Sequence, residues 1–90
     1  FYVYIIQSLK NGTYYIGQTN DLNKRLFKHN NNQSKFTKNK GPWVLKYFSI
    51  HHSRIDALRE EKRIKSKKSK KYIDYLINSS GQMHPVSDGT

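Results

Sequence analysis

Five side chains in this sequence have the types and the spacing that phosphodiester hydrolysis requires. They are Tyr4, Tyr15, Arg25, His29 and Glu61. A guanidinium beside the scissile phosphate stabilises the transition state preferentially, because that state carries more negative charge than the substrate. Tyrosine or histidine can relay the proton of an attacking water. A hydrated divalent metal stabilises the leaving alkoxide and needs only one or two carboxylates.

The acidic residues restrict the mechanism that this chain can use. The sequence contains only six Asp and Glu residues, with no Asp-x-Asp cluster, and it has no cysteine for a thiolate metal site. Two-metal catalysis needs several converging carboxylates and is therefore not expected. A phosphate loop of the Walker type is also missing. The residues leave a mechanism with one metal held by one carboxylate.

The charge of the chain indicates a polyanionic partner. Lys and Arg number 17 in 90 residues, which gives a formal net charge of +11. Nucleic acid is the expected partner of such a domain, although a solvated basic surface would have the same composition. Among these residues, the expected phosphate contacts are Lys24, Lys28, Lys35, Lys38, Lys62, Lys65, Lys67 and Lys68.

Residues 1–19 have the pattern of a β-hairpin. Two runs rich in β-branched and aromatic residues flank Asn11-Gly12, a dipeptide that tolerates positive φ. A two-residue loop there would pair Ile6 with Gly17. Side chains alternate between the two faces of a strand. We therefore expect Tyr4 and Tyr15 to share a face with Gly17, where the bare glycine leaves room for a phosphate backbone.

The next segment, residues 19–30, is expected to be a short helix capped by Thr19 or Asn20. Positions 22, 25, 26 and 29 lie on one helical stripe, which should be apolar. Arg25 and His29 occupy that stripe one turn apart. Inward polar groups are costly and usually mark a site, while a rotated helix would leave both side chains exposed.

Three more elements are expected after a polar loop over residues 30–41. The aromatic Phe36 in that loop would either stack on a nucleobase or pack onto the core. Residues 43–50 have the pattern of a third strand. A helix over residues 54–66 has Ser53 as its expected N-cap, and a last helix is expected to begin near Ser69 and to end around residues 78–81.

The helix over residues 54–66 is expected to direct one glutamate inward. The mean direction of its apolar side chains falls almost on Glu61, with Glu60 nearer the edge of the stripe. The alternative is an exposed Glu61 paired with Lys65 one turn away. The apolar residues that define the stripe are Ile55, Ala57, Leu58 and Ile64.

The expected fold class is α+β, with a small three-stranded antiparallel sheet flanked by helices. We expect one domain over residues 1–78 and a disordered tail over residues 79–90. No stretch has the length and apolar character of a membrane span, and no signal peptide is recognisable. Together with the missing cysteines, this favours a cytoplasmic protein without a membrane partner.

Four short motifs in this order resemble the GIY-YIG nuclease superfamily. The resemblance is strongest to the small single-domain bacterial branch related to the nuclease domain of the excision-repair endonuclease, and it covers about residues 2–78. Tyr2 stands where the family name has glycine, and Gln18 stands where some relatives carry a lysine. The motifs are Tyr2-Val3-Tyr4, Tyr15-Ile16-Gly17, Asp21-Leu22-x-x-Arg25-Leu26-x-x-His29 and Ala57-Leu58-x-x-Glu61-x-x-Ile64-Lys65.

The resemblance implies metal-dependent cleavage of DNA without a small-molecule cofactor. Tyr4 and Tyr15 would act around the attacking water and the scissile phosphate. Arg25 would stabilise the transition state, and His29 would assist proton transfer. Glu61 would bind Mg²⁺ or Mn²⁺. The alternative from another class is a basic nucleic-acid-binding module without catalysis, which would bind DNA in a salt-sensitive way and need no metal.

Overall fold

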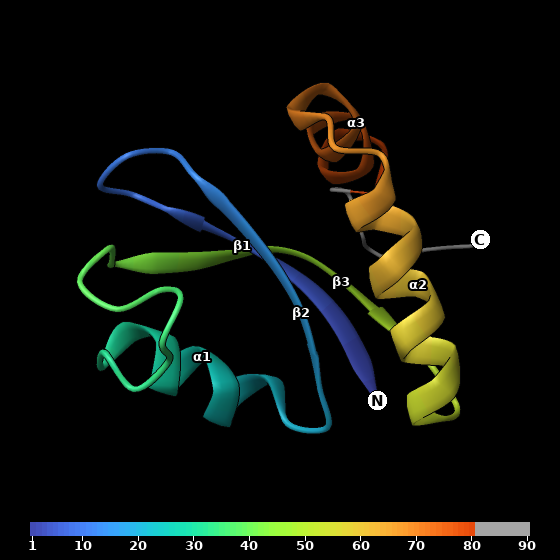
Figure 1. The fold of residues 1–90 in the computed structure, drawn as a ribbon, viewed down its shortest axis with the longest axis horizontal. Coiled ribbons are helices and arrows are strands. Elements are labelled where there is room, and N and C mark those ends of the chain that lie inside the picture. Colours follow the sequence, from blue (N-terminus) through green and yellow to red (C-terminus); the bar gives the residue numbers. More distant parts are fainter. Residues whose placement is uncertain (81–90) are drawn as a thin grey trace.

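The structure is a computed structural model that describes residues 1–80, and it has an α+β fold (Figure 1). Strands β1 (Tyr2–Ser8), β2 (Tyr14–Thr19) and β3 (Trp43–Ile50) form an antiparallel sheet in the order β2-β1-β3. The first helix, α1 (Leu22–Asn30), covers one face of this sheet. Helices α2 (Arg54–Ser66) and α3 (Lys70–Ser80) lie on the other side (Figure 1). The expected fold class is confirmed.

The hairpin register differs from the expected one by two residues. Tyr4 pairs with Gly17 and Ile6 pairs with Tyr15, so a two-residue loop at Asn11-Gly12 is wrong. The longer loop forms because the buried Ser8 hydroxyl accepts hydrogen bonds from two loop amides, those of residues 10 and 11. Gly12 still supplies a positive φ of 78°. A shift of two preserves the alternation of side chains, so Tyr4 and Tyr15 share a face as expected.

The two faces of the sheet bury separate hydrophobic clusters. Val3 and Ile5 point toward α2 and α3, where they pack with Tyr47, Ala57, Ile64 and Ile73. Tyr4 and Ile6 point toward α1, where they pack with Trp43 and contact Tyr15, Leu22 and Leu26. Four consecutive residues of β1 are therefore buried, as expected for a central strand with both faces covered.

Side-chain caps define where α1 and α2 begin. The Asp21 carboxylate accepts a hydrogen bond from the Lys24 amide at 3.0 Å, so Asp21 is the N-cap of α1. The expected cap at Thr19 or Asn20 is wrong, because the Thr19 hydroxyl instead accepts a hydrogen bond from the Asp21 amide. Ser53 caps α2 as expected, accepting from the Asp56 amide at 3.1 Å.

The buried stripe of α2 is narrower than expected. Ala57 and Ile64 are buried, whereas Ile55 is 61% exposed and Leu58 is 39% exposed. Assigning all four to one buried stripe is therefore wrong, because α2 rests on the sheet along a single row of contacts. Glu61 follows Ala57 by one turn and precedes Ile64 by three residues, so it lies on this row, and its side chain is 15% exposed.

Helix α3 extends to Ser80, so the first two residues of the tail expected over residues 79–90 are helical. The remaining positions, 81–90, lie outside the described residues. Within residues 1–80, no helix combines the length and the apolar character that crossing a membrane requires.

Candidate active site

Tyr4 lies at the centre of the candidate site. Its side chain is 2% exposed and extends from the central strand across Gly17 of β2. A Cβ atom at position 17 would lie 2.6 Å from the Tyr4 hydroxyl oxygen and 2.8 Å from Cζ. Glycine is therefore the residue that lets the phenol reach over the edge strand, rather than a requirement of backbone conformation. Tyr4 and Gly17 share a face as expected, but the space over Gly17 is filled by the Tyr4 phenol, so the expectation that this glycine leaves room for a phosphate backbone is wrong.

A chain of hydrogen bonds runs from Tyr4 into the protein. The Tyr4 hydroxyl is 2.8 Å from His29 Nε2, and His29 Nδ1 is 2.7 Å from the Thr37 hydroxyl. His29 and Thr37 are both fully buried. A neutral imidazole donates through one nitrogen and accepts through the other, and both hydroxyls can do either. The chain can therefore transfer a proton in either direction.

The loop that carries Thr37 is held in place from β3. The Trp43 indole N–H donates to the Thr37 carbonyl oxygen at 3.2 Å, and the Asn30 side chain forms hydrogen bonds with both the amide and the carbonyl of Trp43. Sequence reasoning missed Thr37 as a partner of His29. It lies eight positions after His29 in an irregular loop, where no periodicity indicates its direction.

Burial shifts the pKa values of both members of this pair toward the neutral forms. Burial raises the pKa of Tyr4 well above its usual range; the nearby Tyr15 phenol adds to the rise, and Arg25 opposes it. Burial, together with the Arg25 guanidinium, lowers the pKa of His29 to about 4. At neutral pH the histidine is uncharged and can accept a proton.

Tyr15 of β2 and Arg25 of α1 both lie near the Tyr4–His29 pair. The Tyr15 ring centroid is 6.4 Å from that of Tyr4 and 5.1 Å from that of His29. The half-buried Arg25 guanidinium is near enough to the Tyr4 hydroxyl to favour its ionised form, which lowers the pKa of Tyr4 against the effect of burial. The rotated α1 that would expose His29 is excluded, because His29 is fully buried.

Arg25 also opens onto a small polar cleft. The cleft has a volume of about 120 Å³ and contains no apolar side chain among its lining residues, which suits a phosphate group. Two of the lysines expected to contact phosphates, Lys24 and Lys28, take part in it. The lining residues are Thr19, Asn20, Asp21, Lys24, Arg25 and Lys28.

The two glutamates of α2 point toward different parts of the sheet. Glu60 forms a bidentate ion pair with Arg63 at 2.9 and 2.7 Å, which lowers the pKa of its carboxyl. Its charge acts on Tyr47 of β3. The charge of Glu61 acts on Tyr4 instead. Of the two glutamates, Glu61 is the one whose charge acts on the Tyr4 hydroxyl.

The candidate site has one carboxylate that could bind a metal ion, that of Glu61. Among residues 1–80, no three His, Cys, Asp or Glu side chains gather closely enough to hold an ion between them. Glu61 Oε2 is 2.6 Å from the ammonium nitrogen of Lys65, so the ion pair of the alternative interpretation forms, but the Glu61 side chain is only 15% exposed. One partly buried carboxylate is sufficient for Mg²⁺, because this ion keeps several of its waters, and Lys65 competes with it for Glu61 Oε2.

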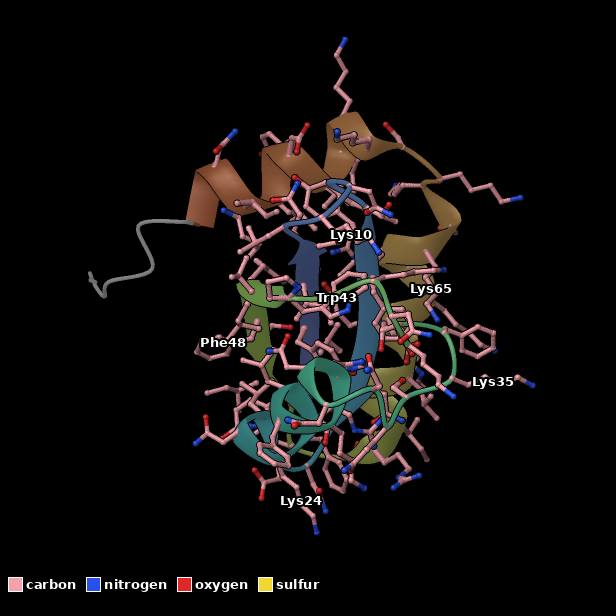
Figure 2. All side chains as sticks on the ribbon, turned by 90° about the vertical axis from the view of Figure 1, so that its left-hand side faces the viewer. Lys10, Lys24, Lys35, Trp43, Phe48 and Lys65 are labelled. Carbon is pink, nitrogen blue, oxygen red and sulfur yellow. The ribbon has the colours of Figure 1, made fainter. Side chains whose placement is uncertain are left out.

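The lysines expected to contact nucleic acid come from three segments: α1, the loop before β3, and the second half of α2 with the residues just after it. Figure 2 shows Lys35 and Lys65 on the same side of the molecule, with Lys24 at the lower end of the view. All eight lysines are exposed except Lys28, which is half-buried. Phe36 is 67% exposed and does not pack onto the core, and Lys35 lies 6.0 Å from its ring.

The buried His29 predicts a loss of stability in mild acid. Its pKa is about 4 in the folded protein and about 6.5 in the unfolded chain, so protons favour unfolding. As the pH falls from 6.5 toward 4, the free energy of unfolding should fall with a slope approaching about 1.4 kcal/mol per pH unit. Urea denaturation at a series of pH values measures this slope.

The matched control for this prediction is the exposed His52. Replacing His29 with glutamine should remove the slope above pH 5, whereas His52→Gln should keep it. The lowered pKa of Glu60 adds a similar loss only at lower pH, since carboxylates in unfolded chains titrate near pH 4. A slope that survives in His29→Gln would contradict the assignment.

The fold is a small α+β domain. Its candidate site combines two tyrosines from β1 and β2, an arginine and a histidine from α1, and a glutamate from α2. The family model of the GIY-YIG catalytic domain matches residues 1–73. The chain therefore belongs to the GIY-YIG family of nuclease domains, as the motifs indicate.

Its relatives are UPF0213 proteins. A UPF0213 protein of Staphylococcus saprophyticus is 39% identical over 66 residues, which is 72% of this chain and 79% of the relative. A UPF0213 protein of Halobacterium salinarum is 37% identical over 65 residues, covering 71% of this chain and 83% of the relative. The solution NMR structure of a UPF0213 protein of Bacillus halodurans has a TM-score of 0.57 and 32% identity, with 89% of this chain and 84% of that chain covered.

Proposed function

We propose that this protein is a metal-dependent DNA endonuclease that hydrolyses phosphodiester bonds. The observation that carries the proposal is the buried Tyr4–His29 hydrogen bond, with the charges of Arg25 and Glu61 acting on the Tyr4 hydroxyl from helices on opposite sides of the sheet. Membership of the GIY-YIG family supports the same reaction.

In the proposed mechanism, the Tyr4–His29 pair handles the proton of the attacking water. Tyr4 has a raised pKa and stays protonated at neutral pH, so it needs a partner that removes its proton as it accepts another. The neutral His29, 2.8 Å away, is that partner. Thr37 orients the imidazole through its other nitrogen.

Arg25 and a metal ion held by Glu61 would stabilise the negative charge that develops on the phosphate in the transition state. Arg25 lines the cleft together with Lys24 and Lys28, and its charge also acts on the Tyr4 hydroxyl, so a phosphate bound in the cleft would contact it. Glu61 would hold Mg²⁺ or Mn²⁺. When bound, the ion would neutralise developing charge on the leaving oxygen. Lys65 must release Glu61 for the metal to bind, since it occupies the carboxylate now.

The direct test is cleavage of supercoiled, branched and damaged DNA by the purified protein. We expect nicked products with Mg²⁺ or Mn²⁺ and none with excess chelator. The alternative function, a basic binding module, is favoured by the net charge of +11. It predicts DNA binding that weakens with salt but no product with any metal. Binding without cleavage on every substrate would overturn the endonuclease proposal.

A further inference from the structure

A pocket of about 480 Å³ lies outside the candidate active site, between the tip of the hairpin and the corner where α2 meets α3. Its size is within the range of pockets that bind small organic groups. It lies on the α2 and α3 side of the sheet, because it includes Ile16 and excludes Tyr15. Its lining residues are Asn11, Gly12, Thr13, Tyr14, Ile16, Ile64, Lys65, Lys68, Ser69, Lys70 and Ile73.

The walls of this pocket divide by chemistry. The partly buried Ile16 and the Tyr14 ring supply most of the accessible apolar surface, because Ile64 and Ile73 at the base of the pocket are 1% and 9% exposed. Lys65, Lys68 and Lys70 supply positive charge, and no lining residue is acidic. A ligand that complements such walls has a flat or apolar body attached to an anionic group. A nucleotide has this composition, with a base that stacks and a phosphate that pairs with ammonium groups.

Tyr14 is held as a fixed wall of the pocket. Its hydroxyl donates to Asp74 Oδ1 at 2.5 Å, and burial together with this carboxylate raises the pKa of Tyr14 to about 12. Lys70 Nζ lies 5.9 Å from the ring centroid. The ring therefore cannot turn freely, and its position beside an ammonium group is favourable for a base and a phosphate of one nucleotide.

The pocket and the candidate active site lie on opposite faces of the same edge strand. Tyr14 and Ile16 alternate with Tyr15 and Gly17 along β2, so one pair faces the pocket and the other faces Tyr4. Lys65 connects the two, because it lines the pocket and its ammonium group pairs with Glu61. A DNA strand that crosses the edge of β2 would contact both sites in succession.

We propose that this pocket binds one unpaired nucleotide of the substrate strand next to the scissile phosphate. The base packs against Tyr14 and Ile16, and its phosphate pairs with Lys68 and Lys70. A base in an intact duplex is stacked and paired and must leave the helix to enter such a pocket, which costs free energy. The protein should therefore prefer DNA with a single-stranded segment. This inference rests on the proposed function for the identity of the ligand as DNA.

The test measures binding rather than cleavage. We use the unmodified full chain with excess chelator, which should keep the DNA intact and leaves the Glu61–Lys65 pair in place, and compare a blunt duplex with a forked duplex by fluorescence anisotropy. The forked DNA should bind at least about fivefold more tightly, from the stacking of one base. Adding Lys68→Gln and Lys70→Gln should remove this preference. The control pair, Lys46→Gln and Lys71→Gln, removes the same charge from exposed positions outside the pocket and should weaken both DNAs equally.

A second measurement locates the base. A 5-iodouracil at the first unpaired position of the forked DNA should crosslink to Tyr14 on irradiation, as mass spectrometry would show. Equal effects of the two lysine pairs on both DNAs, or a crosslink away from the pocket, would overturn the inference. Equal displacement by poly-glutamate and by single-stranded DNA of the same charge would overturn it in favour of an acidic protein partner. If the unmodified chain cleaves DNA but binds forked and blunt DNA equally well, the inference about the pocket is refuted and the proposed function stands. If it prefers forked DNA but cleaves none, the proposed function is refuted and the inference about the pocket stands.

Discussion

Replacing Glu61 with glutamine should lower metal-dependent DNA cleavage by about 10²–10³-fold, as expected when one main source of transition-state charge stabilisation is removed. Glu61 is the glutamate whose charge acts on Tyr4, and the glutamine is nearly isosteric but neutral. The loss should appear in the reaction rate and in binding of Mn²⁺ to the protein, measured by calorimetry.

The effect on folding should be small. The substitution removes one i,i+4 ion pair with Lys65, which is worth only a few tenths of a kcal/mol. Thermal denaturation should therefore place the variant within a few degrees of the unmodified protein. A large loss of stability would mean that the carboxylate holds the fold rather than the metal.

Glu60 provides a matched control on the same helix turn. Its carboxylate accepts two hydrogen bonds from Arg63, and its charge acts on Tyr47 of β3. Glu60→Gln should leave cleavage and Mn²⁺ binding within about twofold of the unmodified protein, since it changes only an exposed ion pair. If Glu60→Gln abolished cleavage and Glu61→Gln did not, the assigned metal ligand would be wrong.

Replacing Gly17 with alanine should reduce both stability and cleavage. Alanine in a strand is normally preferred to glycine by about 0.5–1 kcal/mol. The new methyl group, however, would lie 2.6 Å from the Tyr4 hydroxyl oxygen. Tyr4 is buried and hydrogen-bonded to His29, so it cannot turn away without breaking that contact. The clash should dominate, with a net loss of about 1–3 kcal/mol in the free energy of unfolding.

The loss of cleavage should exceed what unfolding explains. Moving the Tyr4 hydroxyl away from His29 breaks the proposed proton chain even in molecules that remain folded. Cleavage assays at a temperature where the variant is fully folded, judged by circular dichroism, separate the two effects. Gly41→Ala is the control, because its Cβ would meet Trp43 Cδ1 at 3.4 Å, an ordinary contact. Full activity in Gly17→Ala would show that cleavage does not depend on the position of the Tyr4 hydroxyl above Gly17.

Much of the fold follows from local patterns in the sequence. The third strand and α2 have the boundaries that the sequence predicts, because an apolar run and a serine cap are local signals. The hairpin register was wrong by two residues, since Ser8 holds the loop through contacts that the Asn-Gly pattern does not report. Because the shift is an even number of residues, each side chain keeps its face of the sheet, and Tyr4 and Tyr15 still share one.

The sequence by itself determined which residue types could reach a common site, because periodicities of 2.0 and 3.6 assign side chains to faces. Only the tertiary structure decided which of them meet. Thr37 reaches His29 from an irregular loop, and the different directions of Glu60 and Glu61 depend on how α2 rests on the sheet. These contacts join segments distant in the chain, and local periodicity carries no information about the distance between such segments.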